Sequence, residues 1–229
     1  MTSVRIKSAF ACRAPASWCG ALARVVFALG CLLACADDAS LITLAKQRYG
    51  AAAGVLVQEW RELIAAQRGA PDAEALKRVN ELFNRRIRFV DDAEVWHQPD
   101  YWATPIEMMG KGAGDCEDYT IAKYFSLREL GIPAAKLRLI YVKARIGGPS
   151  SSITQAHMVL GYYDTPEAQP LVLDNLIGEI RPAAQRPDLV PVFSFNAEGV
   201  YAGGAVSSIE RLSRWKDLQL KMKAEGYAP

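Results

Sequence analysis

A cysteine in a glycine-rich loop, with acids on both sides, is the first candidate for chemistry in this sequence. Cys116 follows the segment Gly110–Gly114; Asp115 precedes it, and Glu117 and Asp118 follow it. The next residues have apolar side chains at helical spacing and then a glycine and a proline, which predicts a helix of about three turns that starts close to the cysteine. Free N–H groups and the positive end of a helix favour a thiolate, the nucleophilic form of cysteine. Cys116 is therefore a candidate nucleophile.

The neighbouring acids oppose that thiolate. One carboxylate about 7 Å away, at an effective dielectric constant of about 20, costs the thiolate roughly 2 kcal/mol. A hard divalent cation bound by Asp115, Glu117 and Asp118 would offset these charges, and clustered carboxylates are the ligands that calcium prefers. The alternative is structural: Cys116 is a small buried apolar residue, and the acids only stabilise the helix start.

The first 36 residues have the pattern of an export signal. They contain four basic residues and no acid, then an apolar run from Val25 to Ala34, which is short for a membrane span. Cleavage after Ala36 fits the small-residue pattern, whereas the residues around Cys35 resemble a lipobox that would leave a lipidated cysteine. An uncleaved anchor is the third reading. The sequence thus predicts export to the periplasm, with inner-membrane association if a lipid or anchor is retained.

Removing this segment changes the sign of the net charge and leaves a single cysteine. The chain has 27 basic and 25 acidic residues, and removing four basic residues leaves 23 against 25, a net charge of −2. No basic stripe remains, so a nucleic-acid partner is not expected. Of the five cysteines only Cys116 lies outside the segment, so it has no intramolecular disulfide partner in an oxidising compartment. Residues 37–229 are enough for one domain with a core, and we expect a monomer.

The rest of the chain predicts helices first and strands afterwards. Amphipathic helices are expected over Ala51–Arg68 and Asp72–Ile87. The aromatic loop of residues 90–105 either forms one wall of the site or contributes Trp96, Tyr101 and Trp102 to the core as ordinary aromatic residues. Strands are expected at Leu137–Lys143, Gln155–Tyr163, Pro170–Asn175 and Val192–Asn196, and a capping box at Ser207–Glu210 predicts the start of a last helix.

A histidine and an aspartate on the predicted strands complete a catalytic set. His157 lies within the second strand and Asp174 ends the third, and an antiparallel pair would bring them together. The imidazole can take the Cys116 proton while the carboxylate fixes its tautomer, and helix N–H groups can bind an oxyanion. The other histidine, His97, lies in a loop and is the weaker candidate. The structural alternatives are a core histidine and an aspartate that only ends a strand.

The sequence resembles the bacterial transglutaminase-like cysteine proteinases, and within them the LapG type. Five segments carry this resemblance, which covers nearly all of the chain after the signal: Asn84–Asp92, Asp100–Pro105, Gly112–Tyr119, Ala156–Leu160 and Leu173–Ile177. It implies an α+β, papain-like fold, with the nucleophile at a helix N-terminus packed on an antiparallel sheet, and Cys116, His157 and Asp174 as the triad. It also implies dependence on Ca²⁺ bound by Asp115 and Glu117, with Asp118 as a further ligand.

The resemblance further implies a substrate and a regulator. The expected substrate is a large adhesin retained in the outer membrane, cut near its N-terminus at a di-alanine site so that the biofilm disperses. The expected inhibitor is an inner-membrane receptor that senses cyclic diguanylate. The segment Ile146–Ile153 looks longer than in the family, which affects loop contacts more than the chemistry. Two alternatives remain: acyl transfer to an amine on the same fold, and a calcium-dependent adaptor without activity.

Overall fold

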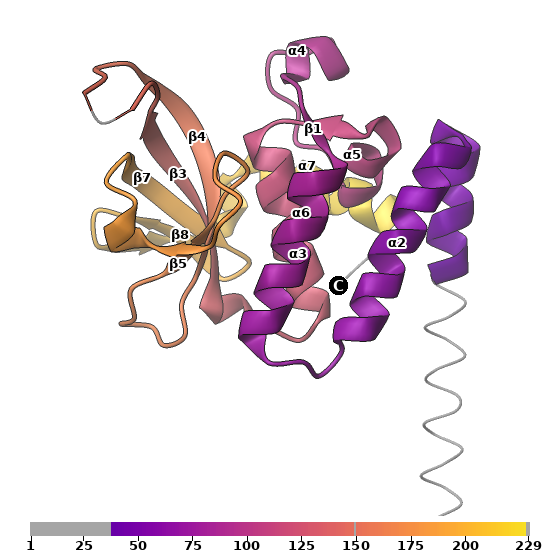
Figure 1. Ribbon diagram of the computed structural model, residues 1–229, viewed down its shortest axis with the longest axis horizontal. Helices are drawn as coiled ribbons and strands as arrows, with labels where there is room; N and C mark the ends of the chain where they lie inside the picture. The colour runs from indigo at the N-terminus through magenta and orange to yellow at the C-terminus, as the bar shows by residue number, and fades with distance from the viewer. Residues whose placement is uncertain (1–37, 149, 228–229) are drawn as a thin grey trace, which may run out of the picture. The chain divides into compact units, whose positions relative to one another are not determined.

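Helices and strands lie on opposite sides of the structure, a computed structural model that describes residues 38–148 and 150–227 (Figure 1). The predicted export signal of residues 1–36 lies outside the described residues. Residues 38–49 are helical, and the further α-helices are α2 (Ala51–Gln67), α3 (Asp72–Arg86), α4 (Asp92–Val95), α5 (Pro105–Lys111), α6 (Cys116–Glu129) and α7 (Ser213–Ala224). Within the described residues, no helix combines the length and apolarity needed to cross a bilayer.

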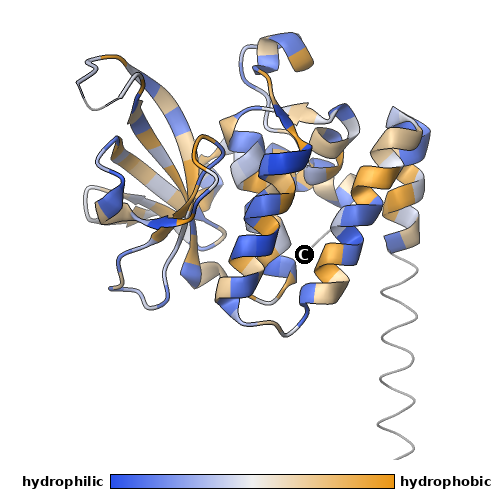
Figure 2. Ribbon diagram, in the orientation of Figure 1, coloured by the Kyte–Doolittle hydropathy of each residue, from blue (hydrophilic) through white to orange (hydrophobic). Residues whose placement is uncertain are grey.

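The structure confirms the two helices predicted from apolar spacing, which are α2 and α3. Each buries one face, which includes Trp60 and Ile64 in α2 and Val79 and Phe83 in α3. Hydrophilic residues cover the side of α3 that faces the viewer in Figure 2. Because burying a large apolar side chain contributes about 1.5–3 kcal/mol, these stripes fix how the two helices pack.

The central helix α6 is surrounded by other elements and carries Cys116 as its first residue. All residues from Asp118 to Leu127 are buried. The Trp60 indole donates a hydrogen bond to Ser126 Oγ (2.8 Å), which joins α2 to α6. The helix ends before Gly131, whose φ of 94° is left-handed, as glycine allows at a helix end.

A seven-stranded antiparallel sheet forms the other layer, with strand order β6-β5-β4-β3-β7-β8-β9. The strands are β3 (Leu137–Arg145), β4 (Thr154–Tyr162), β5 (Leu171–Leu173), β6 (Arg181–Pro182), β7 (Leu189–Asn196), β8 (Gly199–Ala202) and β9 (Ala205–Ser207). Short 3-10 helices occur at η1 (Ala134–Lys136), η2 (Ala183–Gln185) and η3 (Ile209–Arg211). The strands predicted from period-two patterns are β3, β4, β5 and β7, all confirmed with small changes in their ends.

Strand β4 is exposed over its first three residues and buried on both faces from His157 onward. Met158 and Leu160 belong to the main core with the helices, whereas Val159 belongs to a second cluster with Val142 and Val172. The alternation predicted for this strand is therefore confirmed, and each face meets a different environment. The α+β architecture, with the cysteine helix packed on an antiparallel sheet, is also as predicted.

The capping-box prediction is wrong for both the cap and the helix, because Ser207 ends β9 and the cap is Ser208. Ser208 Oγ accepts a hydrogen bond from Glu210 N (3.2 Å), but this turn is the short η3. Leu212 then leaves helical geometry (φ −92°, ψ 89°), so α7 begins only at Ser213. Ser and Thr caps stabilise any first turn, so a cap alone does not determine how far the helix continues.

Candidate active site and calcium centre

The start of α6 is set by a short parallel strand pair. Strand β1 (Arg88–Phe89) pairs with β2 (Ala113–Gly114), and Asp115 then acts as the N-cap of α6. Thr120 Oγ1 lies 2.8 Å from Cys116 O and 3.1 Å from Met158 O, so it ties the first turn of the helix to β4 beside His157. Cys116 is thereby held at the helix N-terminus, as predicted.

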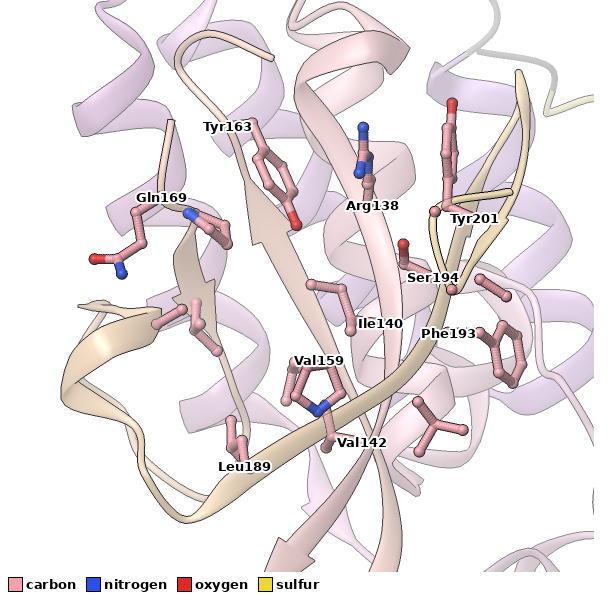
Figure 3. Close-up of a pocket in the computed structure, with 18 of the residues that line it drawn as sticks. Arg138, Ile140, Val142, Val159, Tyr163, Gln169, Leu189, Phe193, Ser194 and Tyr201 are labelled. Carbon is pink, nitrogen blue, oxygen red and sulfur yellow. The ribbon is translucent and has the colours of Figure 1, made fainter. Parts of the chain in front are cut away.

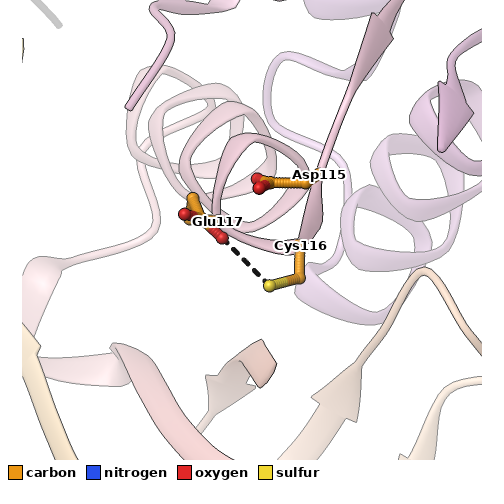
Figure 4. A group of neighbouring side chains, drawn as sticks. All are labelled: Asp115, Cys116 and Glu117. Atoms are coloured by element: carbon orange, nitrogen blue, oxygen red, sulfur yellow. Dashed lines mark hydrogen bonds between the residues drawn. The ribbon is translucent and has the colours of Figure 1, made fainter. Parts of the chain in front are cut away.

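The thiol of Cys116 is half-buried and contacts an acid. Its hydrogen-bond partner is Glu117 Oε2 (3.0 Å), as Figure 4 shows, and not the His157 ring. Burial raises the pKa of Cys116 far above its ordinary value, and the charges of Glu117 and Asp115 raise it further, whereas a backbone hydrogen bond at Met158 lowers it. The thiol is therefore protonated unless a positive charge offsets these carboxylates.

The acids predicted to bind metal do cluster, and two further acids join them. Side-chain donor atoms of Asp92, Asp115 and Asp118 lie within 4.8 Å of one another, and so do those of Asp92, Asp100 and Glu117. Asp92 and Asp100 come from the loop of residues 90–105, which confirms that this loop forms a wall of the site. The sequence analysis missed both, although their position in that loop is a signal that could have suggested them.

The carboxylate cluster fits a hard divalent cation. One oxygen from each of four acids is buried without a hydrogen-bond partner: Asp92 Oδ1, Asp100 Oδ1, Asp115 Oδ1 and Asp118 Oδ2. Two acids are fixed through their other oxygen, because Asp118 Oδ1 accepts from Ala103 N (2.7 Å) and Asp92 Oδ2 accepts from Tyr101 N. Buried anionic oxygens without partners are costly, and bound calcium would satisfy them.

Burial and repulsion between carboxylates also raise the pKa values of Asp115 and Asp92. Burial raises the pKa of Asp115 to about 10, with further contributions from Glu117 and Asp118. Burial likewise raises the pKa of Asp92 to about 6, although the hydrogen bond from Tyr101 N opposes this. A divalent cation in the cluster would reverse both shifts, because opposite charge favours the ionised carboxylate.

The structure brings His157 and Asp174 together as predicted. His157 Nε2 lies 2.8 Å from Asp174 Oδ1, and both side chains are almost fully buried. Burial would raise the pKa of Asp174, but the hydrogen bond and charge of His157, with Leu176 N and Arg186, lower it to about 2. The carboxylate is thus ionised and leaves Nδ1 as the ring atom for proton exchange with a thiol. His97 is exposed and lies in a loop with a φ of 57°.

Two residues that the sequence analysis did not assign hold Asp174 in place. Arg186 Nη2 donates to Asp174 Oδ2 (2.7 Å), and Asn84 Nδ2 donates to the Asp174 carbonyl oxygen (2.7 Å). Arg186 is itself bound by Asp188, with Nη2 2.8 Å from Oδ2. No local pattern marks Arg186, whereas Asn84 opens one of the segments that carry the family resemblance.

Comparisons with known proteins agree with this arrangement. Residues 53–187 match the family described as bacterial transglutaminase-like cysteine proteinase BTLCP. The structure is similar to that of Legionella pneumophila LapG treated with EGTA, with 36% identity and a TM-score of 0.71. The match covers 81% of this chain and 97% of that chain. A calcium-bound structure of the same Legionella protein is 37% identical, with a TM-score of 0.69, and the match covers 81% of this chain and 98% of that one.

A further structure of Legionella pneumophila LapG is also 37% identical, with a TM-score of 0.71, and covers 81% of this chain and 95% of that one. The comparison with curated proteins finds no match. The fold and the family expected from the sequence are therefore confirmed. This chain belongs to the bacterial transglutaminase-like cysteine proteinases.

Proposed function

We propose that this cysteine proteinase is a calcium-dependent periplasmic endopeptidase that uses Cys116, His157 and Asp174 as its triad. The observation that carries the proposal is the buried His157–Asp174 pair. His157 is next to Met158, whose carbonyl oxygen lies 3.1 Å from Thr120 Oγ1 on the helix that Cys116 begins. This arrangement supplies a base, an orienting carboxylate and a nucleophile at a helix N-terminus.

In the proposed reaction, His157 Nδ1 takes the proton from Cys116 Sγ, and the thiolate attacks the carbonyl carbon of the scissile bond. N–H groups at the start of α6 face the developing oxyanion. The imidazolium then donates its proton to the leaving amine, and water hydrolyses the thioester with His157 as the base. Asp174 stays ionised throughout and keeps Nε2 protonated.

Calcium would be held by Asp92, Asp115 and Asp118, with Asp100 and Glu117 adjoining, and would supply positive charge beside the thiol. The presence of calcium-bound and EGTA-treated structures of Legionella LapG supports calcium binding in this chain too. If Glu117 bound this cation, it would no longer accept a hydrogen bond from Cys116, and the thiol proton would be able to pass to His157.

The substrate and the regulator are proposed from the family resemblance. We infer that the substrate is a large surface adhesin cut near its N-terminus at a di-alanine site, which releases it and disperses the biofilm. The inhibitor is the periplasmic domain of an inner-membrane receptor that senses cyclic diguanylate. The export signal of residues 1–36 supports this location, either cleaved or retained with inner-membrane association.

The test is cleavage of an adhesin N-terminal fragment that contains the di-alanine site. The protein is assayed with calcium, with chelator, and with chelator followed by excess calcium. We expect cleavage that chelator abolishes and calcium restores, and none from Cys116→Ala. Intact substrate in every condition, with the fragment still cut by an unrelated protease, would overturn the proposal, and an isopeptide adduct by mass would indicate acyl transfer.

The contact between Cys116 and Glu117 favours one other function, that of a calcium-dependent adaptor without activity. A thiol held protonated by a carboxylate is a poor nucleophile. Labelling by iodoacetamide near neutral pH separates the two proposals. An endopeptidase requires labelling that calcium accelerates, whereas an adaptor gives slow labelling with or without calcium.

A further inference from the structure

The face of the sheet that points away from the helices contains a cavity of about 650 Å³. Its floor consists of branched side chains from three neighbouring strands, Ile140, Val142, Val159 and Val172, which form the second apolar cluster (Figure 3). Sites for small molecules in proteins commonly measure 300–1,000 Å³ and combine an apolar lining with a few polar groups. This cavity has that size and that kind of lining, and the triad does not use it.

One end of the cavity is cationic. The guanidinium carbon of Arg138 lies 4.8 Å from the centre of the Tyr163 ring and 4.1 Å from that of Tyr201 (Figure 3). Its Nε is buried without a hydrogen-bond partner, and Arg138 has no ion pair with a carboxylate in the described part of the chain. The cavity wall also includes Arg186, which is only 2% exposed and whose Nη1 has no hydrogen-bond partner.

A buried N–H donor without a partner is unfavourable, so both arginines call for an acceptor. Asp174 and Asp188 already balance the charge of Arg186, whereas the charge of Arg138 favours an anion. A carboxylate is the planar anion that a guanidinium binds best. Arg138, Ile140 and Val142 alternate along β3 and so point to the same face of the sheet. From Arg138 to Val142 this face spans about 13 Å, with the cation at one end and apolar side chains at the other.

The floor of the cavity favours an acyl chain over a peptide. Strand β3, at the centre of the floor, is paired with β4 on one side and with β7 on the other, so its backbone groups are already used. A peptide lying on this floor would leave its own N–H and C=O groups facing aliphatic side chains, which is costly. We propose that the cavity binds a linear acyl carboxylate of the fatty-acid class, with its carboxylate on Arg138 and its chain over Ile140 and Val159.

The probe is decanoate, used below its micelle concentration, with decan-1-ol as the matched neutral compound. Methyl NMR of the purified protein reports the site directly, because Ile140, Val142, Val159 and Val172 all have methyl groups. We expect decanoate to shift these signals in a saturable way and to bind at least about tenfold more tightly than decanol, since the alcohol lacks the negative charge and the second oxygen that a guanidinium binds.

Two variants test the head-group contact. Arg138→Gln is expected to weaken decanoate binding about tenfold while leaving decanol binding unchanged. Arg181→Gln is the matched control, because Arg181 pairs with Glu179 on the exposed edge strand β6 and does not line the cavity. Unchanged methyl signals in the helical layer verify that both variants are folded.

Three results would overturn the proposal. The first is a shift pattern that misses the cavity methyl groups, and the second is equal affinity for decanoate and decanol in the wild-type protein. The third is tighter binding of a ten-residue apolar peptide with a free carboxylate, which would make the cavity a peptide-docking site. None of these measurements depends on proteolytic activity.

Discussion

Gly114 lies against the carboxylate of Asp118. The proposed calcium site therefore requires that residue 114 has no side chain. A Cβ at this position would lie 2.6 Å from Asp118 Oδ2, the oxygen that has no hydrogen-bond partner. Gly114→Ala must push that oxygen out of the cluster. Because displacing groups that orient a ligand typically costs 10–100-fold in metal affinity, we expect the calcium concentration for half-maximal cleavage to rise by about 10–100-fold.

Gly178→Ala is the control for this substitution. A Cβ there has no neighbour within 4 Å, and the residue does not need a left-handed backbone. Calcium titrations of the two variants are compared with the wild-type protein. An unchanged titration for Gly114→Ala would show that Asp118 Oδ2 is not a ligand.

The ionised state of Asp174 predicts a dependence of stability on pH. Its folded-state pKa is lowered to about 2, whereas the ordinary value is 3.8. A lowered acid pKa stabilises the fold above the ordinary value, and this contribution is lost as pH falls towards the folded value. We expect about 2 kcal/mol of the free energy of unfolding to be lost between about pH 4 and pH 2.

Urea unfolding of wild-type protein and Asp174→Asn across this pH range provides the measurement. The variant has no carboxylate to protonate, so the difference in stability between the two proteins shrinks as pH falls. A difference that stays constant below pH 4 would mean that Asp174 is not held ionised by its neighbours.

At the scale of elements, helix α3 supports the loop that carries Asp174, the aspartate of the proposed triad. Two asparagines one turn apart donate to this loop: Asn84 to the carbonyl of Asp174 (2.7 Å) and Asn80 to that of Gly178 (2.9 Å). Removing either bond is expected to lower the free energy of unfolding by about 1 kcal/mol. Only Asn84→Ala is expected to lower kcat several-fold, because its partner is Asp174 itself.

Kinetics and unfolding of Asn84→Ala and Asn80→Ala test this role together. Equal losses of stability with unequal losses of kcat are the expected pattern. If the two variants lost kcat equally, α3 would support the loop as a whole and would not position Asp174.

Apolar spacing in the sequence predicted the long elements because each of them buries a face. The helices α2 and α3 are of this kind, whereas α6 is buried all round from Asp118 to Leu127 and β4 is buried on both faces from His157. The short elements β1, β2 and α4 could not be predicted, because β1 and β2 have two residues each and α4 has four. Contacts distant in sequence hold them, such as the hydrogen bond from Arg88 N to Gly112 O (3.1 Å). Helix α5 was missed although Thr104 and Glu107 form a capping box with a proline at the first helical position.

The site divides in the same way. Cys116 and its three neighbouring acids were found from the sequence because they are adjacent in it, and His157 and Asp174 because strand pairing was predicted. Asp92 and Arg186 reach the site only through the folded loops. Nothing in the local sequence distinguishes Arg186 from an ordinary surface charge, whereas Asp92 ends one of the segments that carry the family resemblance.

For the whole molecule, calcium is expected to act as a stabilising ligand as well as an activator. The carboxylate cluster joins the start of α6 to the loop of residues 90–105, so it is complete only in the folded chain. A ligand at about 100 times its Kd stabilises the native state by about 2.7 kcal/mol. Chelator is therefore expected to lower Tm by roughly 5–10 °C.

Thermal unfolding with calcium, with chelator, and with magnesium in place of calcium provides this test. Magnesium is expected to restore little, since it prefers a near-octahedral shell that retains water. A Tm that is the same with calcium and with chelator would mean that the cluster binds no cation, even if activity responded to calcium through the substrate.

Arg186 contacts both Asp174 of the proposed triad and the cavity on the outer face of the sheet. Its Nη2 binds Asp174, while the same guanidinium belongs to the cavity wall. Free-energy coupling between two sites is reciprocal: whatever one ligand does to the affinity of a second, the second does to the first. We expect occupancy of the cavity and reaction at the thiol to be coupled through this guanidinium, so that an inhibitor bound covalently to Cys116 changes the affinity of the cavity for its ligand.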